Sequence, residues 1–212
     1  MKRPLFIILF ILLCDQTLKF WVKTHMYLGQ EIHVLDNWFI LHFTENNGMA
    51  FGLQLAGESG KLFLSIVRLL AILALGYYLI HLVRKKAHRG LVICISLIFA
   101  GATGNMIDSA FYGLLFSESN FFHPAVFLPH SGGYSFFLLG KVVDMLYFPI
   151  VQWHWPAWVP VIGTREFTFF RPIFNIADSS ITVGVLALIF FQKRFFRKKV
   201  ATPETTMTNE SS

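Results

Sequence analysis

The chain has 212 residues, of which 55% are hydrophobic and only 14% are charged, and its mean hydropathy is +0.57. These proportions exclude an ordinary soluble domain and indicate an integral membrane protein. The net charge of +6 does not indicate nucleic-acid binding, because the cations cluster beside the predicted membrane spans. The two cysteines lie in apolar spans and predict neither a disulfide framework nor a metal site.

Four apolar spans are long enough to cross a membrane, because a helix needs about 20 residues to span a hydrocarbon core of about 30 Å. They lie near residues 4–22, 62–83, 91–113 and 174–195. The first span follows Lys2 and Arg3 and so resembles a signal peptide, but its apolar character resumes after Asp15, and we expect a retained helix. The sequence predicts one membrane-embedded domain over residues 1–200, followed by a polar, disordered cytoplasmic tail over residues 201–212.

The distribution of lysine and arginine predicts how these spans are oriented. Cations precede the first span, fill the link between the second and third, and follow the fourth. Four crossings would place all of these clusters on one side. Because Lys and Arg are enriched on the cytoplasmic side of membrane proteins, we expect both termini in the cytoplasm. The segments 24–60 and 114–172, which are poor in cations, would then face outward.

The two outer segments carry different signals. Residues 38–44 are rich in aromatic and β-branched side chains, and the turn signal Asn46-Asn47-Gly48 follows them, which predicts a small sheet on the outer membrane face. The second outer segment is rich in Phe, Trp and Pro, and we expect it at the membrane interface, where Trp is enriched. The predicted class is a mainly α integral membrane protein: four transmembrane helices with a small extracytoplasmic β-sheet and an interfacial aromatic-rich segment.

Polar residues gather in the outer halves of the spans. Asp15 and Lys19 are four residues apart on one helix and can form a structural ion pair. Further polar or small residues share one face of the third span or stand at the start of the fourth: Gly101, Gly104, Asn105, Asp108, Asn175 and Asp178. The glycines would let a neighbouring helix approach closely. The inner halves are almost purely apolar, which favours one outward-opening polar pocket over an ion pathway through the membrane.

Asp144 and Asp178 are the candidate catalytic residues, because acids in apolar surroundings are costly and are functional candidates by default. Asp144 interrupts an apolar run, and Asp178 stands at the mouth of the last span. Two neighbouring carboxylates share a proton, so the ionised one can take a proton from water while the protonated one polarises a carbonyl. This pattern predicts hydrolysis of a peptide bond without a covalent intermediate.

Other interpretations of these residues stay open at this point. The polar face could only join helices in a structural protein, or the carboxylates could carry protons or cations in a small coupled transporter. Asp178 could be an ordinary helix cap, in competition with Ser179 and Ser180. Either serine could form a nucleophilic pair with Lys141. A metal site is a remaining alternative for three histidines of the outer segment: His123, His130 and His154. The zinc-binding motif HExxH is missing from the sequence, and we expect no metal or cofactor.

Five sequence blocks follow one another along most of the chain. They are Asp15-Gln16 with Lys19, Asn46-x-Gly48-x-Ala50-Phe51-Gly52, Gly101-x-x-Gly104-Asn105-x-x-Asp108, Val142-Val143-Asp144 and Phe174-Asn175-x-Ala177-Asp178. In this order, on four spans, the blocks resemble those of lipoprotein signal peptidase (signal peptidase II), a family of bacterial aspartic membrane proteases. The resemblance covers most of the chain, and the combination of blocks is more specific than any one of them.

The resemblance implies that Asp144 and Asp178 are the catalytic pair. It also implies a set of residues that shape the pocket or bind substrate: Asn46, Gly48, Gly101, Asn105, Asp108 and Asn175. The implied substrate is a diacylglyceryl-modified prolipoprotein, cleaved just before its lipidated cysteine at the outer face of the bacterial inner membrane. Membrane lipid and globomycin-type inhibitors are the other implied partners. No nucleic acid, cofactor or obligate protein partner is implied.

The chain departs from the family pattern in two places. Ser109 stands where the family usually has Arg. A contact to substrate or to a neighbouring carboxylate would then be lost, or supplied by Arg68 or Lys141. The outer segments on either side of Asp144 are longer than usual, and their aromatic stretches could form a lid over the site.

Overall fold

The computed structural model describes residues 2–47, 57–149, 151–154, 166–169 and 172–196. Four of the described helices are long and apolar enough to cross a membrane: α1 (Lys2–His25), α2 (Gly57–Arg84), α3 (Arg89–Ile107, continued by further helical turns to Leu115) and α5 (Ile176–Phe195). The four helices expected from the sequence are confirmed, although α2 begins earlier than expected, at Gly57.

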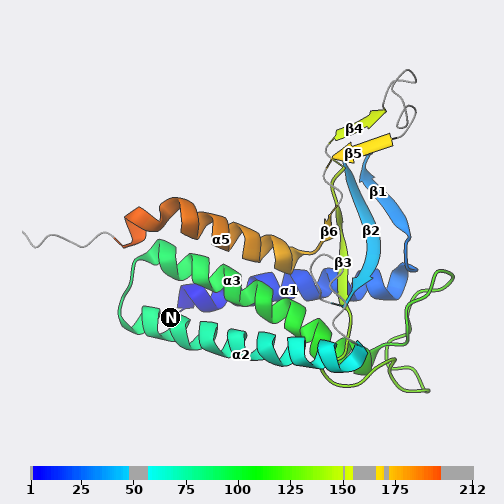
Figure 1. Ribbon diagram of the computed structural model, residues 1–212, viewed down its shortest axis with the longest axis horizontal. Helices are drawn as coiled ribbons and strands as arrows, with labels where there is room; N and C mark the ends of the chain where they lie inside the picture. Colours follow the sequence, from blue (N-terminus) through cyan, green and yellow to red (C-terminus); the bar gives the residue numbers. More distant parts are fainter. Residues whose placement is uncertain (1, 48–56, 150, 155–165, 170–171, 197–212) are drawn as a thin grey trace, which may run out of the picture.

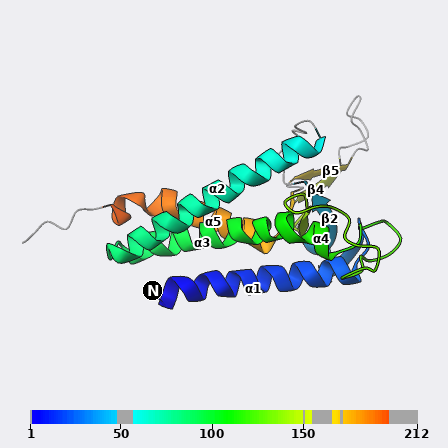
Figure 2. The same cartoon turned by 90° about the horizontal axis from the view of Figure 1, so that it is seen from below.

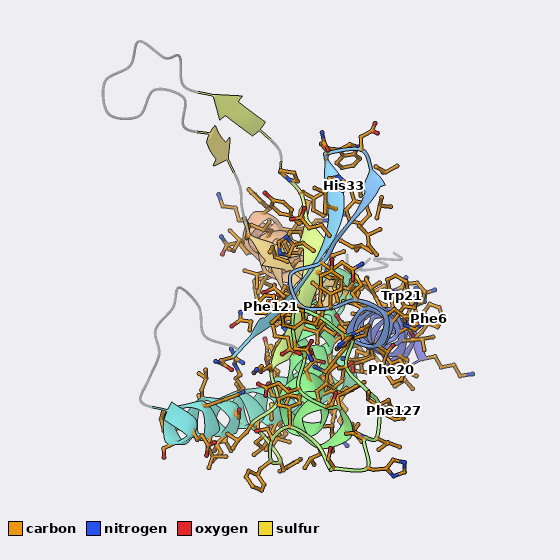
Figure 3. All side chains as sticks on the ribbon, turned by 90° about the vertical axis from the view of Figure 1, so that its right-hand side faces the viewer. Phe6, Phe20, Trp21, His33, Phe121 and Phe127 are labelled. Carbon is orange, nitrogen blue, oxygen red and sulfur yellow. The ribbon has the colours of Figure 1, made fainter. Side chains whose placement is uncertain are left out.

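Helix α3 lies at the centre of the helical part. It packs against α1, α2 and α5, and about half of its apolar span is buried, whereas the other three helices expose most of theirs. Figure 2 shows α1 and α2 on opposite sides of α3. Large apolar side chains such as Phe6 and Trp21 project outward from α1 (Figure 3), as expected for a surface that faces lipid.

Two glycines of α3 allow it to pack closely against α5. A Cβ atom at Gly101 would collide with the backbone carbonyl of Ala177. At Gly104 it would lie 2.8 Å from Asp15 Oδ2 and 3.2 Å from the Cβ of Ala177. The expectation that these glycines admit a neighbouring helix is therefore confirmed, and α5 is that helix.

A four-stranded antiparallel sheet stands at one end of the helices, across from the end that holds the start of α1 and the α2–α3 link (Figure 1). Its strand order is β1 (Glu31–Leu35), β2 (Phe39–Asn46), β3 (Val142–Tyr147) and β6 (Ile173–Phe174). Strands β4 (Val151–His154) and β5 (Glu166–Phe169) form a separate antiparallel pair. The predicted small sheet is confirmed, and the second outer segment contributes β3 to it.

An apolar cluster attaches the sheet to the end of α1. Its fully buried members include Val22 of α1, Met26 just after that helix, Phe43 of β2 and Val143 of β3. In the register of the sheet, Thr44 of β2 lies opposite Asp144 of β3. The cluster therefore fixes the position of β3 relative to the end of α1. It thereby also fixes the position of Asp144.

The end of α3 widens into a π-helical turn, η2 (Asp108–Tyr112), followed by α4 (Gly113–Leu115). Turns of π-helix are rare in proteins, and those that occur are frequently found at functional sites. Several predicted features lie outside the described residues: Gly48 and the block 50–52, the Trp- and Pro-rich stretch 155–165, and the tail 201–212.

Candidate active site

A fully buried lysine of α1, Lys19, is the centre of the candidate site. Its ammonium nitrogen lies 3.0 Å from Asp15 Oδ2 and 2.8 Å from Asp108 Oδ2. It also donates a 2.9 Å hydrogen bond to Asn105 Oδ1. The Asp15–Lys19 ion pair is therefore present, within a larger cluster. Because a lone buried charge is very costly, the cation and its two carboxylates depend on one another for burial.

The two carboxylates bound by Lys19 fix the elements that carry the candidate catalytic acids. Asp15 Oδ1 accepts a 2.8 Å hydrogen bond from the backbone N–H of Ala177, in the first turn of α5. Asp108 Oδ2 accepts a 3.2 Å hydrogen bond from the backbone N–H of Val143, next to Asp144 on β3. The start of α5 and the middle of β3 are thus both tied to one charged cluster.

Two asparagines connect Asp144 with Asp178. Asn175 Nδ2 donates a 2.7 Å hydrogen bond to Asp144 Oδ1, and Asn175 Oδ1 accepts one of 2.9 Å from the backbone N–H of Asp178. Asn105 Nδ2 donates a 2.7 Å hydrogen bond to Asp178 Oδ1, and its Oδ1 accepts one of 3.0 Å from Asn175. The structure thus brings the two acids, from a strand and from a helix, into one hydrogen-bonded unit.

Lys19 determines which group of Asn105 faces Asp178. An ammonium group can only donate hydrogen bonds, so the amide oxygen of Asn105 must face Lys19. The same oxygen accepts the hydrogen bond from Asn175, which is consistent with this orientation. The amide nitrogen of Asn105 is thereby directed at the Asp178 carboxylate.

The two acids have different surroundings. Asp144 is only 4% exposed on β3, and burial, followed by the negative charge of Asp178, raises the pKa of Asp144 to about 7. Asp178 is half-buried in the first turn of α5, where the helix dipole favours an anion. Arg68 of α2 interacts electrostatically with Asp178. The surroundings of Asp144 therefore favour its neutral form.

The remaining predicted site residues lie in different settings. Asn46 is exposed at the end of β2, opposite Val142. Gly101 and Asp108 are buried in internal contacts and do not face outward. Gly48 lies outside the described residues. Direct substrate contacts by these residues stay a prediction.

Position 109, where the chain departs from the family pattern, faces the protein interior. Ser109 is 3% exposed, and its hydroxyl donates a 3.1 Å hydrogen bond to the backbone carbonyl of Asn105. Of the two cations considered as replacements, Lys141 lies 3.4 and 3.7 Å from two glutamate side chains. Arg68 instead interacts with Asp178. The structure therefore favours Arg68 over Lys141.

Gln16 joins the charged cluster, although sequence reasoning gave it no separate role. Its amide nitrogen lies 3.1 Å from Asp15 Oδ2 and donates a 2.9 Å hydrogen bond to Asp108 Oδ1. Its amide oxygen accepts a hydrogen bond of 3.3 Å from the Tyr112 hydroxyl. Its place beside Asp15 in the first sequence block was the available signal.

A second buried polar cluster was missed. Lys23 is fully buried, forms an ion pair with Glu45 of β2 and donates a 2.9 Å hydrogen bond to Ser119 Oγ. Ser119 in turn donates a 2.8 Å hydrogen bond to Glu45 Oε1. The spacing of Asp15, Lys19 and Lys23 at every fourth residue of α1 places all three on one helical face, which could have predicted it.

Several alternative roles are not supported by the contacts. Asn175, rather than Asp178, is the N-cap of α5, because its side chain accepts from the backbone N–H three residues on. The hydroxyls of Ser179 and Ser180 donate to the backbone carbonyls of Asn175 and Leu97. Within the described part of the chain, no group of three or more His, Cys, Asp or Glu side chains is arranged to hold a metal ion.

Comparison with known proteins shows the family to which the chain belongs. The family model for signal peptidase (SPase) II matches residues 7–194. A lipoprotein signal peptidase of Porphyromonas gingivalis is 48% identical over 184 residues, which cover 86% of this chain and 79% of that protein. One of Amoebophilus asiaticus is 34% identical over 208 residues, which cover 97% and 84%.

Solved structures show the same architecture. A structure described as a bacterial membrane enzyme has a TM-score of 0.58 and 27% sequence identity, and the match covers 91% of this chain and 93% of that one. A second, at 24% identity, also has a TM-score of 0.58 and covers 95% of both chains. The chain therefore belongs to the signal peptidase II family, the aspartic membrane proteases that remove signal peptides from lipoproteins.

Proposed function

We propose that Asp144 and Asp178 activate one water molecule between them and cleave the signal peptide without a covalent intermediate. The observation that carries this proposal is the hydrogen-bonded unit in which Asn105 and Asn175 join two acids of different surroundings. Pairs of titratable groups whose environments separate their pKa values are the usual basis for assigning an acid and a base.

The surroundings suggest a role for each acid. Asp178 is the ionised member and removes a proton from the water, whose oxygen attacks the scissile carbonyl. Asp144 is the protonated member and donates its proton to the carbonyl oxygen as negative charge develops there. The proton held by Asp178 then passes to the leaving amide nitrogen. The peptide bond breaks as one hydroxyl of the tetrahedral intermediate returns a proton to Asp144, so both acids regain their starting states. The raised pKa of Asp144, about 7, supports its role as the acid.

Arg68 is a candidate for the cation that the family usually supplies at position 109. It interacts electrostatically with Asp178, so it would place a positive charge beside the carboxylate that activates the water. We expect Arg68→Gln to reduce cleavage more than Lys141→Gln does, because Lys141 contacts glutamates of another cluster.

The proposed substrate is a prolipoprotein whose cysteine carries diacylglycerol. Its lipid would stay in the bilayer, and its scissile bond would reach the acids sideways, at the end of the helices beside the β2–β3 pair. Asn46 at the end of β2, with Gly48 beyond it, would bind the substrate backbone. Asn105 and Asn175 would hold the acids, whereas Gly101 and Asp108 would shape the site.

The proposed location is the inner membrane of a bacterium, with both termini in the cytoplasm and the acids at the outer face. The start of α1, the α2–α3 link and the end of α5 share one end of the helices, and each carries lysine or arginine (Figure 1). This agrees with the enrichment of cations on the cytoplasmic side. Residues 1–200 would form the single protease domain, and residues 201–212 its tail.

Cleavage of a purified lipidated precursor by isosteric variants tests the mechanism. Asp144→Asn and Asp178→Asn should each lower the cleavage rate at least about 100-fold, the usual contribution of an acid or base. Asp36→Asn, at an exposed turn of the sheet, is the matched control and should cleave normally. Circular dichroism establishes that each variant folds. Normal cleavage by either active-site variant would refute the mechanism.

The substrate part of the proposal has its own test. The wild-type protein is given the same precursor with and without diacylglycerol on its cysteine, and with and without globomycin. We expect cleavage only of the lipidated form, and its loss when globomycin is added. Equal cleavage of both precursors would refute the requirement for diacylglycerol while leaving the roles of Asp144 and Asp178 to the variant experiment.

The alternative function, a proton- or cation-coupled transporter, is not favoured by any contact among the described residues. The buried charged clusters of Lys19 and Lys23 lie toward the sheet end of the helices. Other buried hydroxyls in the helices, such as Ser96 and Ser180, donate to backbone carbonyls. Substrate-driven proton flux in vesicles, with no cleavage of a lipidated precursor, would support the transporter instead.

A further inference from the structure

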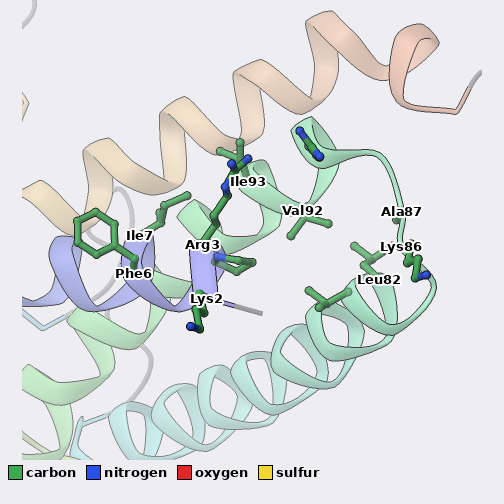
Figure 4. Close-up of a pocket in the computed structure, with 12 residues that line it drawn as sticks. Lys2, Arg3, Phe6, Ile7, Leu82, Lys86, Ala87, Val92 and Ile93 are labelled. Atoms are coloured by element: carbon green, nitrogen blue, oxygen red, sulfur yellow. The ribbon is translucent and has the colours of Figure 1, made fainter.

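A cavity of about 1040 Å³ lies at the end of the helices opposite the two acids. It is formed by the start of α1, the end of α2, the α2–α3 link and the start of α3 (Figure 4). This cavity shares no lining residue with the candidate active site, so its role is independent of the proposed catalytic mechanism.

The rim of the cavity is cationic. Among the described residues that line it, four are positively charged and none is acidic: Lys2, Arg3, Lys86 and Arg89. All four side chains are exposed. The sequence also contains no Asp or Glu between Glu58 and Asp108, so the cations of the α2–α3 link have no acidic neighbour in sequence to neutralise them. The rim therefore suits a ligand that carries negative charge.

The remainder of the lining is apolar. Leu82 and Val92 are buried at its base, whereas Phe6 and Ile93 stay 70% and 44% exposed. Ile8 of α1 packs against the same apolar cluster as Leu82 and Val92, so the start of α1 lies close to the ends of α2 and α3. A free anion would leave the apolar wall uncovered, and an uncharged hydrocarbon would leave the cations without a partner.

We propose that this cavity binds one anionic phospholipid, with the phosphate headgroup between the four cations and an acyl chain against Phe6 and Ile93. The argument is charge complementarity together with position, because basic pockets between membrane helices are suited to anionic headgroups. Long lysine and arginine side chains reach the headgroup while their stems cover apolar surface. The bound lipid would join the start of α1 to the α2–α3 link.

The four cations could also serve only to orient the protein in the membrane. Other cations near the α2–α3 link allow lipid binding to be distinguished from orientation. Arg84 and Lys85 are exposed cations beside the cavity that do not line it, whereas Lys86 and Arg89 do. The double variants Lys86→Gln/Arg89→Gln and Arg84→Gln/Lys85→Gln therefore remove equal charge from one link.

Native mass spectrometry of the purified full chain in detergent measures the binding. Dioleoyl phosphatidylglycerol is titrated against phosphatidylethanolamine with the same acyl chains, and cleavage of a precursor confirms that each variant folds. We expect the wild type to prefer phosphatidylglycerol. The Lys86→Gln/Arg89→Gln variant should bind it about 30-fold more weakly, since each cation near an anionic headgroup contributes about a factor of five.

Three outcomes would overturn the proposal. Equal weakening by the Arg84→Gln/Lys85→Gln control would show general attraction to a basic loop rather than a site. Unchanged affinity in the Lys86→Gln/Arg89→Gln variant would show that the cavity does not hold the headgroup. Displacement of the lipid by an equal concentration of glycerol phosphate, which has no acyl chain, would show that the apolar wall contributes nothing.

Discussion

Replacing Asp144 by asparagine is expected to stabilise the protein at high pH while removing its activity. Burial, and then the charge of Asp178, raises the pKa of Asp144 from 3.8 to about 7. The folded protein keeps this proton up to about pH 7, whereas the unfolded chain releases it near pH 3.8, so the free energy of unfolding falls as pH rises through that window. A shift of about three pKa units corresponds to about 4 kcal/mol.

The asparagine of Asp144→Asn has no proton to release, and its carbonyl oxygen can still accept the hydrogen bond from Asn175. We expect wild type and variant to be similarly stable at pH 4, and the variant to be more stable by up to about 4 kcal/mol at pH 8. Thermal unfolding in one detergent, followed by circular dichroism from pH 4 to 9, measures the difference.

The exposed Asp36→Asn variant is the control for this experiment, and its stability relative to wild type should change little with pH. Parallel pH profiles for wild type and Asp144→Asn would refute the reasoning. They would mean that the Asp144 carboxyl ionises as readily in the folded protein as in the unfolded chain, and that its surroundings do not keep it neutral.

Three further predictions concern the same site. Cleavage of a lipidated precursor should slow as pH rises above about 7, because the raised pKa of Asp144 marks where the proposed acid loses its proton; a constant rate up to pH 9 would contradict this role. Lys19→Met should lower the free energy of unfolding by about 3–5 kcal/mol, because two buried carboxylates lose their cation, whereas the exposed Lys193→Met should not; denaturant titration measures both. Gly101→Val should lower stability and the cleavage rate together, because the valine side chain would collide with Ala177. Unchanged thermal unfolding of this variant would show that α3 and α5 can separate freely.

The helices could be predicted from the sequence because long apolar spans have few alternative structures. Strand β2 could also be predicted, from its aromatic and β-branched composition before a turn signal. Strand β3 was not predicted, because Val142–Tyr147 is a nearly continuous apolar run that has no alternation of apolar and polar residues. Such a run does not distinguish a strand buried on both faces from a short helical segment.

The site could be predicted only where its residues share one element. The spacing along α1 and along α3 identified Lys19 and Asn105, each with its neighbours on one helical face. The contacts between elements could not be derived in this way, because they depend on how α3, α5 and β3 pack. Asn175 is an example of a residue whose contacts could not be predicted. Its spacing from Asp178 suggested a shared site, but it did not suggest that Asn175 caps α5 and also binds Asp144. Likewise, the ion pair of Lys23 with Glu45 depends on the sheet docking against α1.

The difference between the two acids follows from the secondary structures that carry them. A helix N-terminus stabilises an anion through its dipole and its unpaired N–H groups, whereas a strand has almost no net dipole. Asp178 is in the first turn of α5 and accepts a hydrogen bond from Asn105, while Asp144 is buried in β3. If both acids stood at helix N-termini, both would be stabilised as anions and would repel each other. The pairing of a strand with a helix start therefore gives a reason for a small sheet beside the membrane helices: it carries Asp144, the acid whose raised pKa suits the proposed role of proton donor.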